Sequence, residues 1–233
     1  MDCCICSNDM IYKFSSKILN NYNISYFYCE NCGFLRTEAP YWLNESYKSV
    51  INLSDTGILS RNIYLSKITS LIIYFFFDKD ANYLDFGGGY GIFTRIMRDI
   101  GLNFYWYDPY CNNILSKGFE YDNNKEIELI TSFESFEHLV KPLETLENML
   151  NISRNILFTT ELLPKEIPEP NNWWYYGLEH GQHISFYSRK TLEYISKKYN
   201  LNFYTNGRNI HLFSEDKLDI KKFRQKFTIA END

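Results

Sequence analysis

Four glycines near the centre of the chain could bind a ligand through the backbone. They follow Asp85 and a short apolar run, and they are Gly87, Gly88, Gly89 and Gly91. Residues without a Cβ let the backbone pass close to a nucleotide-like ligand, and the helix that follows such a turn adds free N–H groups. A second apolar run ends at Asp108, where a carboxylate can accept hydrogen bonds from the two hydroxyls of a ribose. This pattern predicts that the chain binds a molecule containing adenosine.

The spacing of these glycines indicates which adenosine cofactor is bound. A dinucleotide site needs Gly-x-Gly-x-x-Gly, whereas this turn has Gly-x-Gly-x-Gly, with Ile92 in place of the third dinucleotide glycine. Asp85, just before the turn, would repel a pyrophosphate and attract a cation. S-adenosylmethionine carries a sulfonium and an ammonium group and has no phosphate, so we predict it as the cofactor. The alternative is a glycine-rich turn that binds nothing.

Residues 82–212 resemble the class I S-adenosylmethionine-dependent methyltransferases, although Gly88 stands where many members have cysteine. The resemblance implies that the glycine turn wraps the methionine part of the cofactor and that Asp108 holds the ribose. It also implies that residues 133–138 form a Glu-His turn beside the cofactor, and residues 179–186 resemble a motif of a small-molecule subgroup. The implied cofactor-binding residues are Asp85, Gly87, Gly88, Gly89, Gly91, Asp108, Pro109, Phe133 and Glu134.

Five of the six cysteines lie within the first 32 residues. Two Cys-x-x-Cys pairs, Cys3 with Cys6 and Cys29 with Cys32, supply four thiolates, which is the ligand set of a structural Zn²⁺ site. Four thiolates leave no open coordination position, so the metal is expected to be structural. Cys4 could replace Cys3 as a ligand, and two disulfides would be the alternative in a secreted protein.

The histidines fall where a methyltransferase needs a base. Methyl transfer from a sulfonium is an in-line displacement, and a hydroxyl nucleophile must lose its proton. Because ligands bind beyond the carboxyl ends of parallel strands, the loops after the first, second, fourth and fifth strands should meet at one site. The candidate catalytic residues in these loops are His138, Glu179, His180 and His183. A structural role for His180 and His183 is the alternative, and residues 173–176 could line a substrate or only pack the loop.

The elements that must position these residues alternate between strand and helix. We predict strands at 83–86, 104–107, 127–131 and 155–160, helices at 92–100, 142–150 and 188–199, a weak strand near 119–121 and a final hairpin at 201–204 and 210–214. This order predicts an α/β fold, a doubly wound, mostly parallel seven-stranded sheet of Rossmann-like methyltransferase type with a small N-terminal zinc ribbon. The predicted units are a zinc ribbon at 1–40, a largely helical cofactor cover at 41–80, a methyltransferase domain at 81–215 with a lid loop at 163–187, and a tail at 216–233.

Composition and charge exclude several classes of protein. With 45% hydrophobic and 18% aromatic residues, the 233-residue chain is not expected to be disordered. Its longest dense apolar run, residues 71–77, is too short for a membrane span. A formal charge of −5 makes nucleic acid an unfavoured partner. The N-terminus shows no secretory signal, and we expect a cytoplasmic protein.

These observations predict methyl transfer to a hydroxyl of a small molecule. The resemblance implies a sugar, a nucleotide sugar or a precursor of a surface polysaccharide as the substrate. An RNA methyltransferase that grips its substrate with the ribbon is one alternative, although residues 1–40 carry three basic and four acidic side chains. A cofactor-binding assembly protein without turnover is another. The sequence leaves the oligomeric state open.

Overall fold

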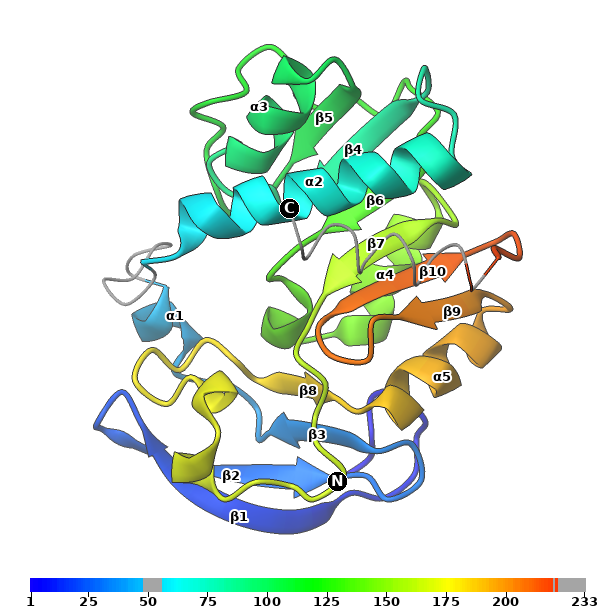
Figure 1. Cartoon of the computed structure of the whole chain (residues 1–233). Coiled ribbons are helices and arrows are strands. Elements are labelled where there is room, and N and C mark those ends of the chain that lie inside the picture. The colour runs from blue at the N-terminus through cyan, green and yellow to red at the C-terminus, as the bar shows by residue number, and fades with distance from the viewer. Residues whose placement is uncertain (48–55, 220, 222–233) are drawn as a thin grey trace.

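The computed structural model describes residues 1–47, 56–219 and 221, and Figure 1 shows two sheets linked by helices. The strands are β1 (Ile11–Ile18), β2 (Tyr22–Tyr28), β3 (Phe34–Thr37), β4 (Asn82–Phe86), β5 (Asn103–Tyr107), β6 (Leu129–Ser132), β7 (Ile156–Thr159), β8 (Ser185–Tyr187), β9 (Asn202–Thr205) and β10 (Ile210–Ser214). The α-helices are α1 (Leu43–Ser46), α2 (Ile58–Phe76), α3 (Ile92–Asp99), α4 (Pro142–Leu150) and α5 (Arg189–Lys198). Three 3₁₀ turns are η1 (Phe136–His138), η2 (Pro170–Asn172) and η3 (Trp174–Tyr176).

The larger sheet has the strand order β5-β4-β6-β7-β10-β9. Strands β5, β4, β6 and β7 run parallel to one another, and β10 is antiparallel to both β7 and β9. Beyond β5, the place of a seventh strand is marked by a parallel bridge between Trp106 and Glu120, where the weak strand was predicted. The predicted fold class, a doubly wound and mostly parallel methyltransferase sheet, is confirmed.

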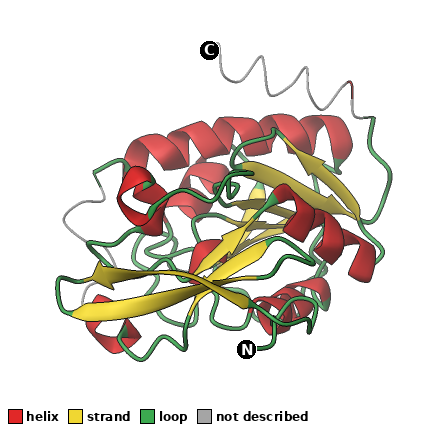
Figure 2. Ribbon diagram, turned by 90° about the horizontal axis from the view of Figure 1, so that it is seen from below, coloured by secondary structure: helices red, strands yellow, loops and turns green. Residues whose placement is uncertain are grey.

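Alternation along the strands divides the core into two layers. On one face of the sheet, Tyr83 and Leu157 pack against Phe93 and Met97 of α3. Residues of α2 belong to the same apolar cluster. Leu84 and Phe158, the chain neighbours of Tyr83 and Leu157, face the opposite side, where α4 and α5 pack. Because side chains of a strand alternate between its faces, an apolar run such as residues 156–158 of β7 is buried on both sides. Figure 2 shows the long helix α2 beside the strands.

The smaller sheet joins the N-terminal ribbon to the predicted lid loop. Its order is β1-β2-β3-β8, and β8 comes from residues 185–187 of that loop. Leu35 of β3 pairs with Phe186 of β8 in antiparallel register. The lid loop therefore supplies the fourth strand of the ribbon's sheet, at the lower end of the molecule in Figure 1.

A third apolar cluster lies between the ribbon and the lid loop. It contains Ile24 and Tyr26 of β2, Trp42 before α1, and Tyr175 and Tyr176 of η3. Tyr176 is fully buried, whereas the neighbouring Trp174 is 74% exposed. Of the two interpretations of the aromatic run, packing therefore applies to the two tyrosines, which pack against the ribbon.

Several predicted elements fall partly on residues outside the described part. The largely helical unit predicted at 41–80 contains α1 and α2, and residues 48–55 between them lie outside the described residues. Most of the predicted tail at 216–233 lies outside them as well. Within the described residues, no helix combines the length and apolar character needed to span a bilayer.

Candidate active site and metal centre

Just before the glycine turn, β4 carries a buried carboxylate. Asp85 is only 3% exposed. Its Oδ2 accepts a hydrogen bond of 2.9 Å from the Thr94 hydroxyl of α3, and its Oδ1 accepts one of 3.2 Å from the Thr131 hydroxyl of β6. Burial raises the pKa of Asp85 to about 7, although the two hydroxyl donors oppose this rise. Asp85 therefore joins three elements beneath the turn, a role that the sequence pattern alone did not indicate.

The second predicted acid lies against the same turn. Asp108, at the end of β5, accepts a 2.9 Å hydrogen bond from the backbone N–H of Gly89 through Oδ2. Its Oδ1 accepts from the backbone N–H groups of Tyr110 and Cys111 at 2.8 and 2.9 Å. The ends of β4 and β5 are thus held together by this carboxylate, as neighbouring parallel strands allow.

The space around the turn fits an adenosine cofactor without phosphate. A Cβ added to Gly89 would meet no heavy atom within 4 Å, so the turn is open beside Asp108. A Cβ added to Gly88 would lie 2.6 Å from Cδ1 of Trp106, so the inner side of the turn is filled. An open backbone next to a carboxylate suits a ribose and a cationic amino acid, and it does not suit a pyrophosphate.

The other predicted cofactor residues lie around these two strand ends. Gly91 precedes α3, and Pro109 is exposed after Asp108. Phe133 packs edge-on against Phe93 of α3, with ring centroids 4.9 Å apart. Glu134 is exposed and lies 3.6 Å from the Arg61 guanidinium of α2. The structure thus gathers the three predicted cofactor segments at the carboxyl ends of β4, β5 and β6.

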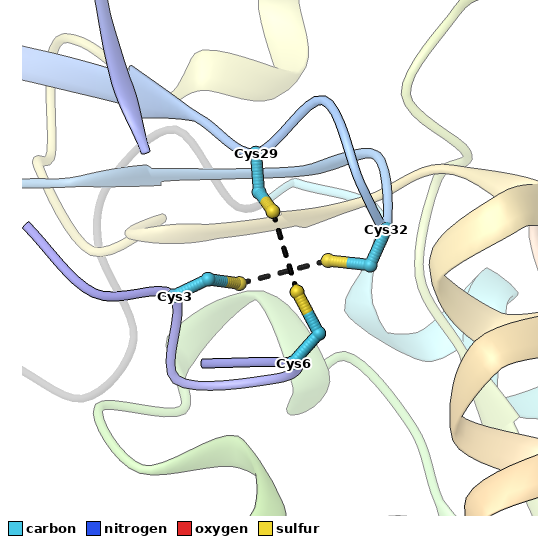
Figure 3. A group of neighbouring side chains, drawn as sticks. All are labelled: Cys3, Cys6, Cys29 and Cys32. Atoms are coloured by element: carbon cyan, nitrogen blue, oxygen red, sulfur yellow. Dashed lines mark hydrogen bonds between the residues drawn. The ribbon is translucent and has the colours of Figure 1, made fainter. Parts of the chain in front are cut away.

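The four cysteines of the two Cys-x-x-Cys pairs converge on one point (Figure 3). The Sγ atoms of Cys3 and Cys32 are 3.6 Å apart, those of Cys6 and Cys29 are 3.4 Å apart, and all four lie within 4.8 Å of one another. Ligands at 2.3 Å from a tetrahedral Zn²⁺ are about 3.8 Å apart. The four sulfurs therefore fit a closed tetrahedral Zn²⁺ site.

Cys4 lies outside this cluster. Burial raises the pKa of the Cys4 thiol, although the Arg36 guanidinium opposes the rise. Of the two ligand choices that the sequence left open, the structure brings Cys3 to the other three cysteines. No disulfide joins the six cysteines, all of which lie in the described part.

The second cysteine pair is attached to the start of α5. Ser188 caps this helix and accepts a hydrogen bond from the backbone N–H of Thr191. The Thr191 hydroxyl in turn donates to the carbonyl oxygen of Cys32 at 3.0 Å. Gly33 has a φ of +77°, and a Cβ there would lie 2.3 Å from Oγ of Ser188, so only glycine fits this contact. The cysteine cluster is thus tied to α5, a helix that packs against the larger sheet.

Three titratable side chains form a second cluster, on η1 and the lid loop. Glu137, His138 and His183 each offer a ligand atom, and these atoms lie within 4.8 Å of one another. Glu137 is 1% exposed, and its Oε2 has no hydrogen-bond partner among the described residues. A backbone hydrogen bond from Ile184 N–H to the Glu137 carbonyl, 2.8 Å long, holds the lid loop on η1. The sequence predicted the two histidines as candidates but not Glu137.

Hydrogen bonds fix which nitrogen of each histidine carries the proton. Nδ1 of His138 lies 3.0 Å from the Gln182 carbonyl oxygen, and Nδ1 of His183 lies 2.6 Å from the Tyr175 carbonyl oxygen. A carbonyl oxygen can only accept, so both Nδ1 atoms donate and both neutral rings have their lone pair on Nε2. In His180 the arrangement is reversed, because its Nδ1 accepts from the backbone N–H of Gln182 at 3.1 Å.

Burial holds these groups in their neutral forms. It lowers the pKa of His138 to about 4 and the pKa of His183 well below its ordinary value. It raises the pKa of Glu137 well above the usual range, and the neighbouring Glu134 adds to this effect. Glu179, the remaining catalytic candidate, is exposed beside His180. The candidates therefore separate into a cluster around the buried Glu137, in which His138 and His183 are half-buried, and the pair of a half-buried His180 and an exposed Glu179.

The buried cluster lies beside the glycine turn. A Cβ on Gly87 would be 2.8 Å from Oγ of Ser135, which stands two residues before Glu137. Trp42, before α1, donates from Nε1 to the Gly181 carbonyl oxygen at 2.8 Å and thereby holds the turn that carries His183. Tyr47 faces the edge of the His138 ring, with centroids 6.2 Å apart. Sequence patterns do not reveal Tyr47 or Trp42, because both reach the site from an otherwise ordinary aromatic segment.

Comparisons with known proteins agree with this geometry. A family model described as a methyltransferase domain matches residues 61–206. A comparison with curated proteins gave no match.

The chain is also similar to the following three solved structures. The chain is 14% identical to human N-acetylserotonin methyltransferase in complex with SAM, covering 76% of this chain and 66% of that one, with a TM-score of 0.46. It is 13% identical to an O-methyltransferase family 2 protein of Planctomyces limnophilus in complex with apigenin, covering 75% and 65%, with a TM-score of 0.47. It is 16% identical to OxaC in complex with sinefungin and meleagrin, covering 59% and 43%, with a TM-score of 0.42. The chain thus spans between about two fifths and two thirds of the length of these proteins.

The family assignment depends on the domain match and on the sheet. The match covers more than half of the chain and includes the glycine turn, Asp108 and the Glu-His turn. The sheet order and the antiparallel β10 are those of the predicted class. The chain therefore belongs to the methyltransferase-domain family, with the fold of the class I S-adenosylmethionine-dependent methyltransferases.

Proposed function

We propose that this chain transfers a methyl group from S-adenosylmethionine to a hydroxyl oxygen of a small molecule. The observation that carries the proposal is the position of the buried cluster of Glu137, His138 and His183 next to an open glycine turn with Asp108 beside it. Bound S-adenosylmethionine supplies a methyl group on a sulfonium sulfur, which leaves as a neutral thioether when the acceptor oxygen attacks in line. The chain must therefore orient two reactants, exclude water and accept one proton.

Cofactor binding is assigned to the residues at the first two strand ends. Asp108 would accept hydrogen bonds from the ribose hydroxyls, and the backbone of Gly87–Gly91 would lie along the amino acid part. Phe133 and Glu134 stand at the end of β6, where they border the same space. Asp85 contributes from beneath the turn, because its hydrogen bonds to Thr94 and Thr131 hold β4, α3 and β6 in place.

Proton acceptance is assigned to the buried cluster. The Nε2 lone pairs of His138 and His183 can accept the proton of the acceptor hydroxyl as its oxygen bonds to the methyl carbon. Burial disfavours a charged imidazole, so neither histidine is expected to hold the proton alone. We therefore assign the proton to the two histidines and Glu137 together, as titratable groups that influence one another. His180 is less suited to this role in the observed arrangement, because its Nδ1 is occupied and its Nε2 carries the hydrogen. Glu179 stays a predicted catalytic residue, exposed next to it.

We infer a sugar, a nucleotide sugar or a precursor of a surface polysaccharide as the acceptor. Trp174 supports this choice, because it is 74% exposed on the lid loop, and an exposed indole face can stack on a sugar ring. The charge of −5 also favours a small substrate over a nucleic acid. The cytoplasmic location stays a prediction.

The ribbon is assigned a structural Zn²⁺, held by Cys3, Cys6, Cys29 and Cys32. Its task would be to fix the lid loop, because β8 of this loop pairs with β3 of the ribbon. In this proposal the ribbon positions His183 and does not grip RNA.

The test is transfer of labelled methyl groups from S-adenosylmethionine to a panel of nucleotide sugars, phosphorylated sugars and RNA. We expect label in a sugar hydroxyl and a drop in kcat of at least tenfold in His183→Asn, with cofactor binding retained. Label in RNA alone would refute the small-molecule assignment. Cofactor binding without turnover on any acceptor would support an assembly protein and contradict the proposed reaction.

A further inference from the structure

The cluster of Glu137, His138 and His183 has the composition of a metal site, separate from the four cysteines. Two imidazoles and one carboxylate are ligands that first-row transition metals share, whereas Mg²⁺ and Ca²⁺ take oxygen ligands. The three ligand atoms lie within 4.8 Å of one another. Two ligands of one ion at about 2.2 Å are at most about 4.4 Å apart, so a shift of a few tenths of an ångström closes the site.

The hydrogen bonds around the two histidines orient them as ligands. In metal sites, the ring nitrogen that does not bind metal donates to a carbonyl or a carboxylate, which fixes the tautomer. Here Nδ1 of His138 donates to the Gln182 carbonyl and Nδ1 of His183 donates to the Tyr175 carbonyl. Both Nε2 lone pairs are therefore available, and the rings face each other edge to face with centroids 5.0 Å apart.

The carboxylate supplies the third ligand and an independent observation. Glu137 is 1% exposed, and its Oε2 has no hydrogen-bond partner in the described part of the chain. A buried carboxyl oxygen without a hydrogen-bond partner is unfavourable, and such a carboxyl becomes a stable carboxylate only when it is paired or binds a metal. A dication between Glu137 and the two Nε2 atoms would satisfy all three groups together.

We propose that Glu137, His138 and His183 bind a divalent first-row transition metal ion of the Zn²⁺ or Co²⁺ class. Three protein ligands leave at least one coordination position open, which is the arrangement of catalytic rather than structural sites. This assignment rests on the proposed function: the hydroxyl oxygen of the acceptor would occupy the open coordination position. A metal bound there would lower the pKa of the coordinated hydroxyl, whose proton would be released to solvent before the oxygen attacks the methyl carbon. In the metal-bound protein the two histidines then act as ligands and not as bases.

The test uses the full chain with Zn²⁺ already bound to the four cysteines. Co²⁺ is titrated in, and the visible absorption of the protein is recorded. We expect one equivalent of Co²⁺ to bind without the thiolate-to-cobalt charge-transfer absorption that a cysteine site would give. Glu137→Gln and His183→Ala should each weaken this binding at least tenfold, while Glu166→Gln, at an exposed glutamate of the lid loop, should leave it unchanged. Mg²⁺ should not compete.

The outcomes separate this inference from the proposed function. No uptake of Co²⁺, or equal uptake by wild type and Glu137→Gln, overturns the metal site even if the chain methylates a sugar. Because Glu137→Gln keeps the shape of the side chain, a folded variant is expected, and circular dichroism checks it. Stoichiometric binding of Co²⁺ lost in both variants supports the site, even where no acceptor takes up a methyl group.

Discussion

Replacing the buried Asp85 by asparagine should change how the stability of the protein depends on pH. The carboxyl lies 3% exposed beneath the glycine turn, and burial raises its pKa from 3.8 to about 7. A folded-state pKa above the unfolded value means that the folded protein binds more protons between these two values. The contribution of Asp85 to stability is therefore fully present below pH 3.8 and is lost as the pH rises through 7.

The size of this effect follows from the difference between the two pKa values. A difference of about three pKa units corresponds to about 4 kcal/mol, because each unit is worth about 1.4 kcal/mol. Between about pH 5 and about pH 7 the loss amounts to about 2 kcal/mol. The amide introduced by Asp85→Asn cannot ionise, so the variant gains stability relative to wild type by about this amount over the same interval. This amide can still bond to the hydroxyls of Thr94 and Thr131.

The assay is urea unfolding of the cofactor-free protein at several pH values, followed by tryptophan fluorescence. All other titrating groups are the same in both proteins, so their contributions cancel in the difference between the two free energies of unfolding. Asp99→Asn is the matched control, since Asp99 is exposed on α3 and pairs with Arg95. We expect this control to change the free energy of unfolding by at most about 1 kcal/mol. A difference between Asp85→Asn and wild type that stays constant from about pH 5 to about pH 7 would refute the reasoning.

Three further substitutions test other parts of the account. Gly88→Ala should weaken cofactor binding at least tenfold by calorimetry, because the new Cβ would lie 2.6 Å from Trp106; unchanged affinity would contradict the tight turn. Cys29→Ser should remove one equivalent of zinc by metal analysis and lower the free energy of unfolding by more than about 2 kcal/mol; a fully loaded, equally stable variant would refute the Cys₄ site. Trp42→Phe leaves the Gly181 carbonyl without its donor, so kcat should fall while cofactor affinity is retained; the reverse outcome would argue against loop positioning.

The central sheet could be predicted from the sequence because its pattern is local. The buried strand β7 begins with the apolar run at residues 156–158, and the helix at 142–150 begins at a proline that suits its first turn. The glycine turn and Asp108 follow directly from the ends of these strands. Such features depend on neighbouring residues, so they are visible before any tertiary contact is known.

The links between distant segments could not be predicted in this way. The pairing of β3 with β8 joins residues about 150 positions apart, and nothing in either strand specifies its partner. Glu137 was overlooked because a glutamate next to a histidine is ordinary in sequence, and only its burial makes it unusual. Asp85 was predicted to face the cofactor. Its hydrogen bonds to Thr94 and Thr131 could not be predicted, because they form only where β4, α3 and β6 come together in the folded chain.

Calorimetric titration of S-adenosylmethionine into wild type and Asp108→Ala tests the central claim most directly. Asp108 lies beside the open backbone of Gly89 at the end of β5, and the loss of a hydrogen bond to a charged group is worth about 1.5–3 kcal/mol. We expect one site per chain in wild type and an affinity at least about tenfold weaker in Asp108→Ala, with Asp99→Ala unchanged. Equal affinity in all three proteins, or no binding to wild type, would contradict the account.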